Sequence, residues 1–147
     1  MLTKGNFNQI FGIFHSCCAS GSDGKQDLYD FEIDEHHFKD RLANCVDIVV
    51  LLEDGSKLAC TLHVNCQDNL IRIACDRQVR EIKFKSVKKI LHTKEELSRV
   101  QTNGCPINYG TTVAFHLVEN GNCIPLSFNN THEKKLFLNI LSPYILV

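Results

Sequence analysis

The sequence lacks the features that mark several common classes of protein. It has no uninterrupted apolar run of about 18 or more residues, so no segment is apolar enough to span a bilayer as a helix. Its net charge is only −1 at pH 7, so bulk charge does not favour binding to nucleic acid. With 147 residues, 44% of them hydrophobic and 22% charged, the chain fits one globular domain with an appendage. This composition excludes a disordered chain, a collagen and a long coiled coil.

The chain has eight cysteines, but they lack the spacing of common metal-binding motifs. No Cys-x-x-Cys occurs, and the spacing of Cys60, Cys66 and Cys75 matches no usual zinc pattern. The N-terminal segment also lacks the basic start and apolar stretch of a secretory signal. Adjacent His36 and His37 could hold a metal with Cys45 or nearby carboxylates. However, adjacent side chains point in different directions on a helix or a strand, so the pair alone is a weak signal and exposed histidines without a metal are favoured. The pattern favours free thiols in a reducing compartment, most of them packed as small hydrophobic groups.

The N-terminal residues contain an apolar stripe. At steps of three and four, a helix over residues 6–18 would place these side chains on one face: Phe7, Ile10, Phe11, Phe14 and Cys18. Residues 19–27 are rich in Ser and Gly and predict a flexible linker. The acidic residues that follow are ambiguous between strand and helix, and we favour a short helix over 34–44.

Beyond Cys45 the pattern changes to short alternating segments typical of strands. Asp54-Gly55 and Asn120-Gly121 are hairpin turns, and Thr93 with Glu96 forms a capping box for a short helix. A final helix follows Asn130, with one apolar face. The sequence therefore predicts a mainly β fold: two orthogonal antiparallel sheets over residues 45–128, with seven strands in an open barrel. The helix near residues 130–142 closes it and buries Phe137.

This layout resembles a pleckstrin-homology domain over residues 45–144. The most specific part is Phe115-His116-Leu117, the Asn120-Gly121 turn, an apolar strand, and a helix with Glu133, Phe137 and Ile140 at the family's spacing. Phe137 stands where the family usually has Trp. We take residues 28–147 as this domain and residues 1–27 as an anchoring segment with its linker.

A narrower resemblance is to the inner membrane complex sub-compartment proteins of apicomplexan parasites. It depends on adjacent Cys17 and Cys18 near the N-terminus, a short linker and the lone domain, with support from the stretches at residues 52–55, 88–93 and 121–126. The resemblance implies acylation, attachment to flattened membrane sacs, and roles in cell architecture and daughter-cell formation. The chain has Leu2 where these proteins usually have a glycine for myristoylation. Acylated pleckstrin-homology proteins that sense phosphatidic acid are a related alternative.

The candidate anchor is Cys17 with Cys18. Two acyl chains anchor a protein firmly, whereas one chain or the apolar stripe alone binds reversibly. These residues therefore predict a protein tethered through acyl chains to the cytoplasmic face of a membrane, which the resemblance identifies as the inner membrane complex. In the other interpretation the stripe packs on the domain and the two thiols carry no acyl chain.

The chain has one basic concentration, which is a candidate anion- or partner-binding face: Arg77, Arg80, Lys83, Lys85, Lys88 and Lys89. Inositol phosphates would need cations near the first turn, but residues 45–55 contain no Lys or Arg, and Glu53 with Asp54 makes that turn acidic. The sequence therefore argues against specific phosphoinositide binding and favours an unidentified protein partner. A sensor of anionic lipid remains the alternative.

No motif indicates an enzyme or a cofactor. Cys60 and His63 could pair in nucleophilic catalysis, but nothing around them supplies the other groups such a site needs. Only Phe84 is interleaved with the basic residues, so the stacking platform of a nucleic-acid binder is lacking. We expect a non-enzymatic protein without a nucleic-acid partner, a metal or a cofactor.

Overall fold

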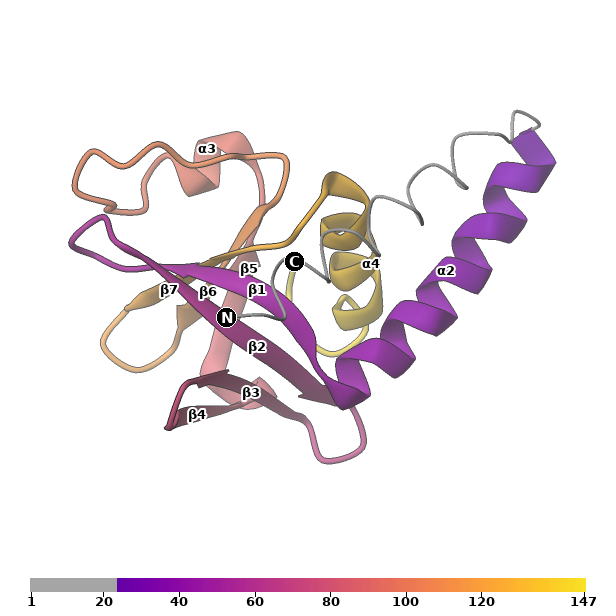
Figure 1. Ribbon diagram of the computed structural model, residues 1–147, viewed down its shortest axis with the longest axis horizontal. Helices are drawn as coiled ribbons and strands as arrows, with labels where there is room; N and C mark the ends of the chain where they lie inside the picture. The colour runs from indigo at the N-terminus through magenta and orange to yellow at the C-terminus, as the bar shows by residue number, and fades with distance from the viewer. Residues whose placement is uncertain (1–23) are drawn as a thin grey trace. The chain divides into compact units, whose positions relative to one another are not determined.

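The computed structural model describes residues 24–147, with side chains from residue 31 onward. The chain divides into two compact units, Met1–Asp34 and Glu35–Val147. The second unit contains all the strands of the described residues and helix α4 (Thr131–Leu141), shown in Figure 1. The predicted anchor at Cys17 and Cys18, the apolar stripe and most of the predicted linker lie outside the described residues.

Seven antiparallel strands form the sheet, in the order β4-β3-β2-β1-β7-β6-β5. Their bounds are β1 Val46–Leu51, β2 Lys57–Asn65, β3 Leu70–Cys75, β4 Gln78–Lys83, β5 Val87–Leu91, β6 Thr112–Leu117 and β7 Cys123–Ser127. Consecutive strands pair as hairpins, except that β1 pairs with β7 and that β4 and β5 are not paired. The predicted pleckstrin-homology-like fold, an open barrel with a C-terminal helix, is confirmed.

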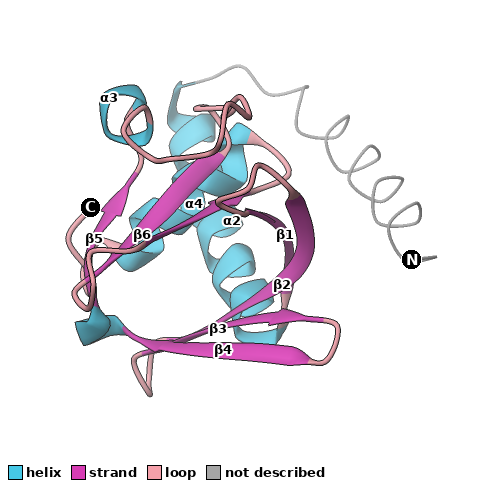
Figure 2. Cartoon of the chain, turned by 90° about the vertical axis from the view of Figure 1, so that its left-hand side faces the viewer, coloured by secondary structure: helices cyan, strands magenta, loops and turns pink. Residues whose placement is uncertain are grey.

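Hydrogen bonds join all seven strands into one sheet, so the two orthogonal sheets of the predicted open barrel are the two halves of this sheet. The link between its halves is short: only Val49 opposite Ser127 and Val50 opposite Leu126 are in register between β1 and β7. The strong twist of short strands turns the halves in different directions. Figure 2 shows β3 and β4 nearly horizontal and β6 rising steeply.

The connections follow from the residues that bend the chain. Gly55 has φ +91° and Asn120 and Gly121 have φ +63°, a left-handed backbone that Gly and Asn tolerate well. The 3-10 turn η1 (Phe84–Ser86) joins β4 to β5. The capping box of Thr93 and Glu96 begins α3 (Lys94–Leu97) as predicted.

The core lies between the sheet and α4. The Asn130 side chain accepts a hydrogen bond from the Glu133 N–H at 2.8 Å and so caps the helix. Phe137 is fully buried, as predicted, with its ring centroid 4.9 Å from that of Phe128 and 6.0 Å from that of Phe115. The C-terminal residues return to β5, one of the two edge strands, where the Ile90 N–H donates to the carbonyl of Leu146 at 2.8 Å.

Helix α2 (Gly24–Asn44) is longer than the short helix expected over residues 34–44. Its start includes residues 24–27, which we had assigned to the linker. Lys25, Gln26 and Leu28 are good helix formers, and Ser and Gly become sparse after residue 24, so the composition changes there. Within the second unit, Phe38 and Leu42 on this helix are buried, and the Phe38 ring packs 6.2 Å from that of Phe128.

Candidate functional site

The β1–β2 turn, where pleckstrin-homology-like domains often hold phosphates, carries its negative charge in a fixed conformation. Asp54 Oδ1 accepts hydrogen bonds from the Ser56 hydroxyl at 2.6 Å and from the Ser56 N–H at 2.8 Å. These two bonds lower the pKa of Asp54, so the carboxylate stays ionised at neutral pH. The two donors of Ser56 are therefore already used within the turn.

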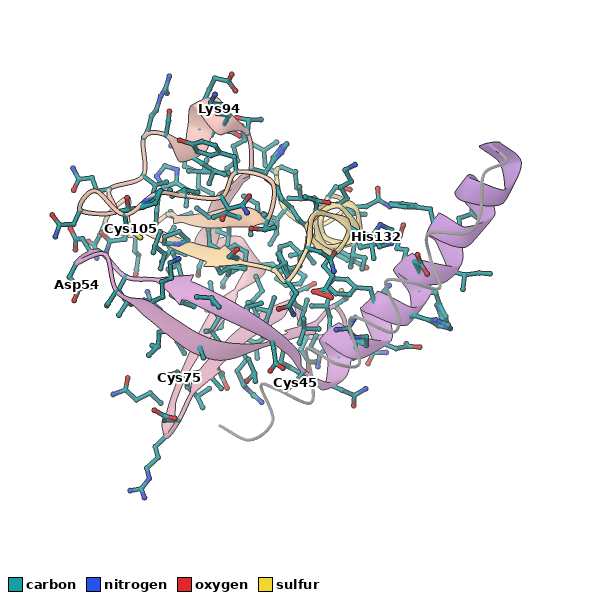
Figure 3. All side chains as sticks on the ribbon, turned by 45° about the horizontal axis from the view of Figure 1, so that its top comes forward. Cys45, Asp54, Cys75, Lys94, Cys105 and His132 are labelled. Carbon is teal, nitrogen blue, oxygen red and sulfur yellow. The ribbon has the colours of Figure 1, made fainter. Side chains whose placement is uncertain are left out.

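A second loop packs on this turn. Asn103 Nδ2 donates to the Asp54 carbonyl at 3.2 Å, and a Cβ added to Gly55 would lie 3.2 Å from the Thr102 carbonyl oxygen. Figure 3 shows Asp54 and Cys105 at the same end of the sheet. An anion that approached Gly55 would therefore meet a carbonyl oxygen as well as the acidic side chain. Phosphate binding is therefore disfavoured here, because the acidic side chain would repel the anion and the second loop occupies the space beside Gly55.

The six residues of the basic concentration do not form one site. Arg77 lies in the β3–β4 turn, where it lines a shallow hollow with Leu58, Cys75, Asp76 and Gln78. On β4, Arg80 is on the face that carries buried Ile82, whereas Lys83 is on the opposite face. Lys85 belongs to η1 and Lys88 to β5.

Lys89 is held by an acid that the sequence analysis did not connect with it. Its Nζ lies 2.5 Å from Glu96 Oε2. Burial of Glu96 raises its pKa, but hydrogen bonds from Lys89 and from the backbone N–H groups of His92 and Thr93 outweigh this and lower the pKa to about 2. Lys89 is therefore neutralised locally. By contrast, Lys83, Lys85 and Lys88 are exposed, and the ion pairs of the described residues include none of them.

Two buried charges near the start of α4 were also missed. Lys134 is 8% exposed, and its Nζ donates to the carbonyls of His92 at 2.7 Å and Tyr109 at 2.5 Å. Glu133 is 3% exposed and lies 3.4 Å from the guanidinium of Arg41 on α2. Both side chains serve the structure, since they bind distant segments to the helix. No local signal separates them from exposed charges.

The structure separates the candidate catalytic pair. Cys60 and His63 have opposite parity on β2, so Cys60 points into the core and His63 to the outer face. Burial is the main cause that raises the pKa of Cys60, to about 11, so only a small fraction of this thiol is ionised at neutral pH. His36 lies 3.8 Å from Asp40, one helical turn away. Within the described residues no three metal-binding side chains gather, and no described helix is long and apolar enough to cross a membrane.

Comparisons with known proteins agree with this fold. The ISP1 C-terminal family matches residues 37–143. Inner membrane complex sub-compartment protein 1 from Toxoplasma gondii is 38% identical, with a TM-score of 0.71, and the match covers 76% of this chain and 90% of that one. Sub-compartment protein 3 from the same organism is 21% identical, with a TM-score of 0.62 over 76% of this chain and 82% of that one, which shows the shared fold. No curated protein gave a significant match. This chain therefore belongs to the ISP1 C-terminal family, which it shares with an inner membrane complex sub-compartment protein.

Proposed function

We propose that this protein is an acylated, non-enzymatic scaffold at the cytoplasmic face of the inner membrane complex. Cys17 and Cys18 carry the acyl chains, and the pleckstrin-homology-like domain binds a protein partner. Membership of the family and the names of its solved relatives support this location. A contribution to cell architecture and daughter-cell formation, which the resemblance to the sub-compartment proteins implies, is part of the same proposal.

The observation that carries the proposal is the state of the β1–β2 turn. A lipid sensor of this fold needs cations and free backbone donors there, but Asp54 is ionised and takes the donors of Ser56. The Asn103 side chain also binds the turn. Membrane attachment therefore has to come from elsewhere in the chain, and the adjacent thiols are its best source, because two acyl chains anchor stably.

The domain offers a protein partner an exposed sheet edge. Residues 78–81 of β4 are exposed, and Val79 is 58% exposed. Among the described residues, no backbone hydrogen bond from another strand occupies the outer side of β4. Such an edge can accept a strand from another chain. Lys83 at its end would favour an acidic partner segment.

The test of the anchor is fractionation of the full chain in parasites with the Cys17→Ser, Cys18→Ser double variant. We expect the double variant to fold normally, to lose its acyl chains in an acyl-exchange assay and to leave the membrane fraction. Each single variant should weaken attachment less. Cys45→Ser is the matched control, because Cys45 is an exposed thiol of the domain and should not change attachment. A double variant that stays with membranes as firmly as the wild type would refute the anchor.

The alternative function is a sensor of anionic lipid, which three exposed lysines favour: Lys83, Lys85 and Lys88. Vesicles that contain phosphatidic acid or a phosphoinositide separate the two functions, with neutral vesicles as the control. For a scaffold we expect only weak association with residues 28–147, and we expect physiological salt to remove it. Tight binding that survives salt and is lost with Lys83→Gln, Lys88→Gln would establish the sensor.

A further inference from the structure

Two cysteines of the domain face each other on neighbouring strands. The β2–β3 ladder pairs Thr61 with Ala74, so the next two residues in the same register are Cys60 and Cys75. The Cα atoms of opposite residues in an antiparallel pair are about 4.5–5.5 Å apart. A disulfide joins Cα atoms that are roughly 4.4–6.8 Å apart, so this pair is within its reach.

Both side chains are on the inner face of the sheet. Cys60 alternates with the buried Leu62 on β2, and Cys75 alternates with the buried Ile73 on β3. The two thiols interact, and this interaction adds to burial in raising the pKa of Cys60 to about 11. They therefore point at each other rather than to opposite sides, which is the second requirement for a bond between them.

The two thiols differ in access to solvent. Cys60 is 6% exposed, whereas Cys75 is only half-buried, at the end of β3. Cys75 also lines the shallow hollow beside the β3–β4 turn, together with Arg77 and Gln78. A small reagent can therefore reach Cys75 first. Asp76 and Arg77 both line this hollow, so their opposite charges neither exclude nor select an anionic reagent.

The other described cysteines have no such partner. Cys123 stands opposite His116, and Cys45 comes directly before β1. Cys66 lies in the β2–β3 turn, and Cys105 lies in the loop that packs on Gly55. Among the cysteines of residues 24–147, only one pair is in register across a ladder.

We propose that Cys60 and Cys75 are a site of reversible oxidation by a small disulfide of the glutathione type. Cys75 loses its proton, and its sulfur attacks the small disulfide, which forms a mixed disulfide and releases one small thiolate. Cys60 then loses its proton and attacks Cys75 Sγ, which expels the second thiolate. Both thiolates take up protons. Two protein thiols are thus oxidised to one disulfide, and one small disulfide is reduced to two thiols.

The bond would change the end of the β2–β3 ladder. It would join β2 to β3 next to the β3–β4 turn and remove the Cys75 thiol from the hollow. Because a crosslink restricts the unfolded chain, the oxidised domain should unfold at a higher temperature than the reduced one. A reductant would reverse both changes.

The test uses the full reduced chain, oxidised glutathione, alkylation of the remaining thiols, and peptide mass spectrometry without reduction. We expect one dominant linked pair, Cys60 with Cys75, which dithiothreitol removes. The single variants should report the order of the steps. Cys60→Ala should hold glutathione on Cys75, whereas Cys75→Ser should leave Cys60 without glutathione, because the reagent reaches Cys60 only through Cys75.

Cys123→Ser is the matched control, since Cys123 is half-buried in a strand but faces a histidine. It should form the Cys60–Cys75 link as the wild type does. The proposal is overturned if folded wild-type chain holds stable glutathione on Cys75 without a link, or if other cysteine pairs link in equal yield. It is also overturned if Cys75→Ser still takes up glutathione at Cys60 while its circular dichroism spectrum is native.

Discussion

The charged side chains of the β1–β2 turn and those at the start of α4 differ in burial and in the distance along the sequence to their hydrogen-bond partners. At the turn, Asp54 is exposed and takes its hydrogen bonds from Ser56, two residues away. At the helix, Glu133 and Lys134 are buried, and their partners are 25 to 92 residues away in the sequence. Hydrogen bonds between neighbouring residues fix the conformation of an exposed turn. Hydrogen bonds between residues far apart in the sequence hold separate segments together. Substitutions should therefore be costly at the helix and mild at the turn.

The largest expected effect concerns the ring that α4 packs against the sheet. Phe137→Ala should lower the free energy of unfolding by about 3–5 kcal/mol, because it leaves a cavity among buried aromatic rings. Urea denaturation of residues 28–147 measures it. Leu146→Ala is a suitable control, since Leu146 is 66% exposed and its truncation leaves no cavity. A loss for Phe137→Ala as small as that of the control would contradict the assigned core.

The buried ammonium should come next. Lys134→Met keeps much of the side-chain volume but leaves the carbonyls of His92 and Tyr109 without their donor. We expect a loss of about 1–3 kcal/mol, the usual cost of leaving buried polar groups unpaired. Lys135→Met is the matched control. Lys135 is the next residue along the helix and its side chain is exposed, so this substitution should change the free energy of unfolding little. Equal effects of the two variants in urea denaturation would contradict this role of Lys134.

The two acids should also respond to pH in opposite directions. Burial is the main cause that raises the pKa of Glu133, although Arg41 opposes it. The folded state then holds a proton that the unfolded state releases above pH 4.5, the ordinary value, so wild-type stability should fall as pH rises through this window. Glu133→Gln lacks that dependence, and its stability relative to wild type should improve as pH rises.

Asp54 gives the matched comparison. Its pKa is lowered in the folded state, so its contribution is present above pH 3.8 and is lost as pH falls below that value. Asp54→Asn should therefore differ most from wild type near neutral pH and least in acid. Urea denaturation across this pH range tests both variants. Parallel pH profiles for the two would show that the contrast between the regions is wrong.

The smallest expected effect is a binding signal at the turn. Titration of residues 28–147 with inositol phosphates should show only weak association that salt screens, because Glu53 and Asp54 repel phosphate and Asn103 binds the turn. Isothermal calorimetry at physiological salt is the measurement. A submicromolar complex there would refute the interpretation of this turn and favour the lipid sensor.

Features set by neighbouring residues were predictable from the sequence. The turns at Gly55 and Gly121, the capping box of Thr93 and Glu96, and the Asn130 cap all depend on contacts within a few residues. The alternation of apolar residues likewise predicted the strands, and the apolar face of the last helix predicted the burial of Phe137.

Features that depend on the folded chain were not predictable. The position of Lys134 next to two distant carbonyls leaves no trace in its local sequence, and neither does the pairing of Lys89 with Glu96 across the β5–α3 connection. The basic concentration looked continuous along the chain, but alternation on β4 and the η1 turn divide it between faces. Contacts of residues far apart in sequence are settled by packing, which local pattern does not encode.

The return of the C-terminal residues to β5 has a consequence for assembly. An open sheet has two edges, and polymers grow when both of them accept strands from other molecules. Here the hydrogen bond from Ile90 to Leu146 covers part of one edge with C-terminal residues, whereas no strand of the described residues pairs with the outer side of β4. A strand from another molecule therefore meets fewer free backbone groups at β5 than at β4. Addition at β4 without addition at β5 gives a pair of molecules rather than a fibre.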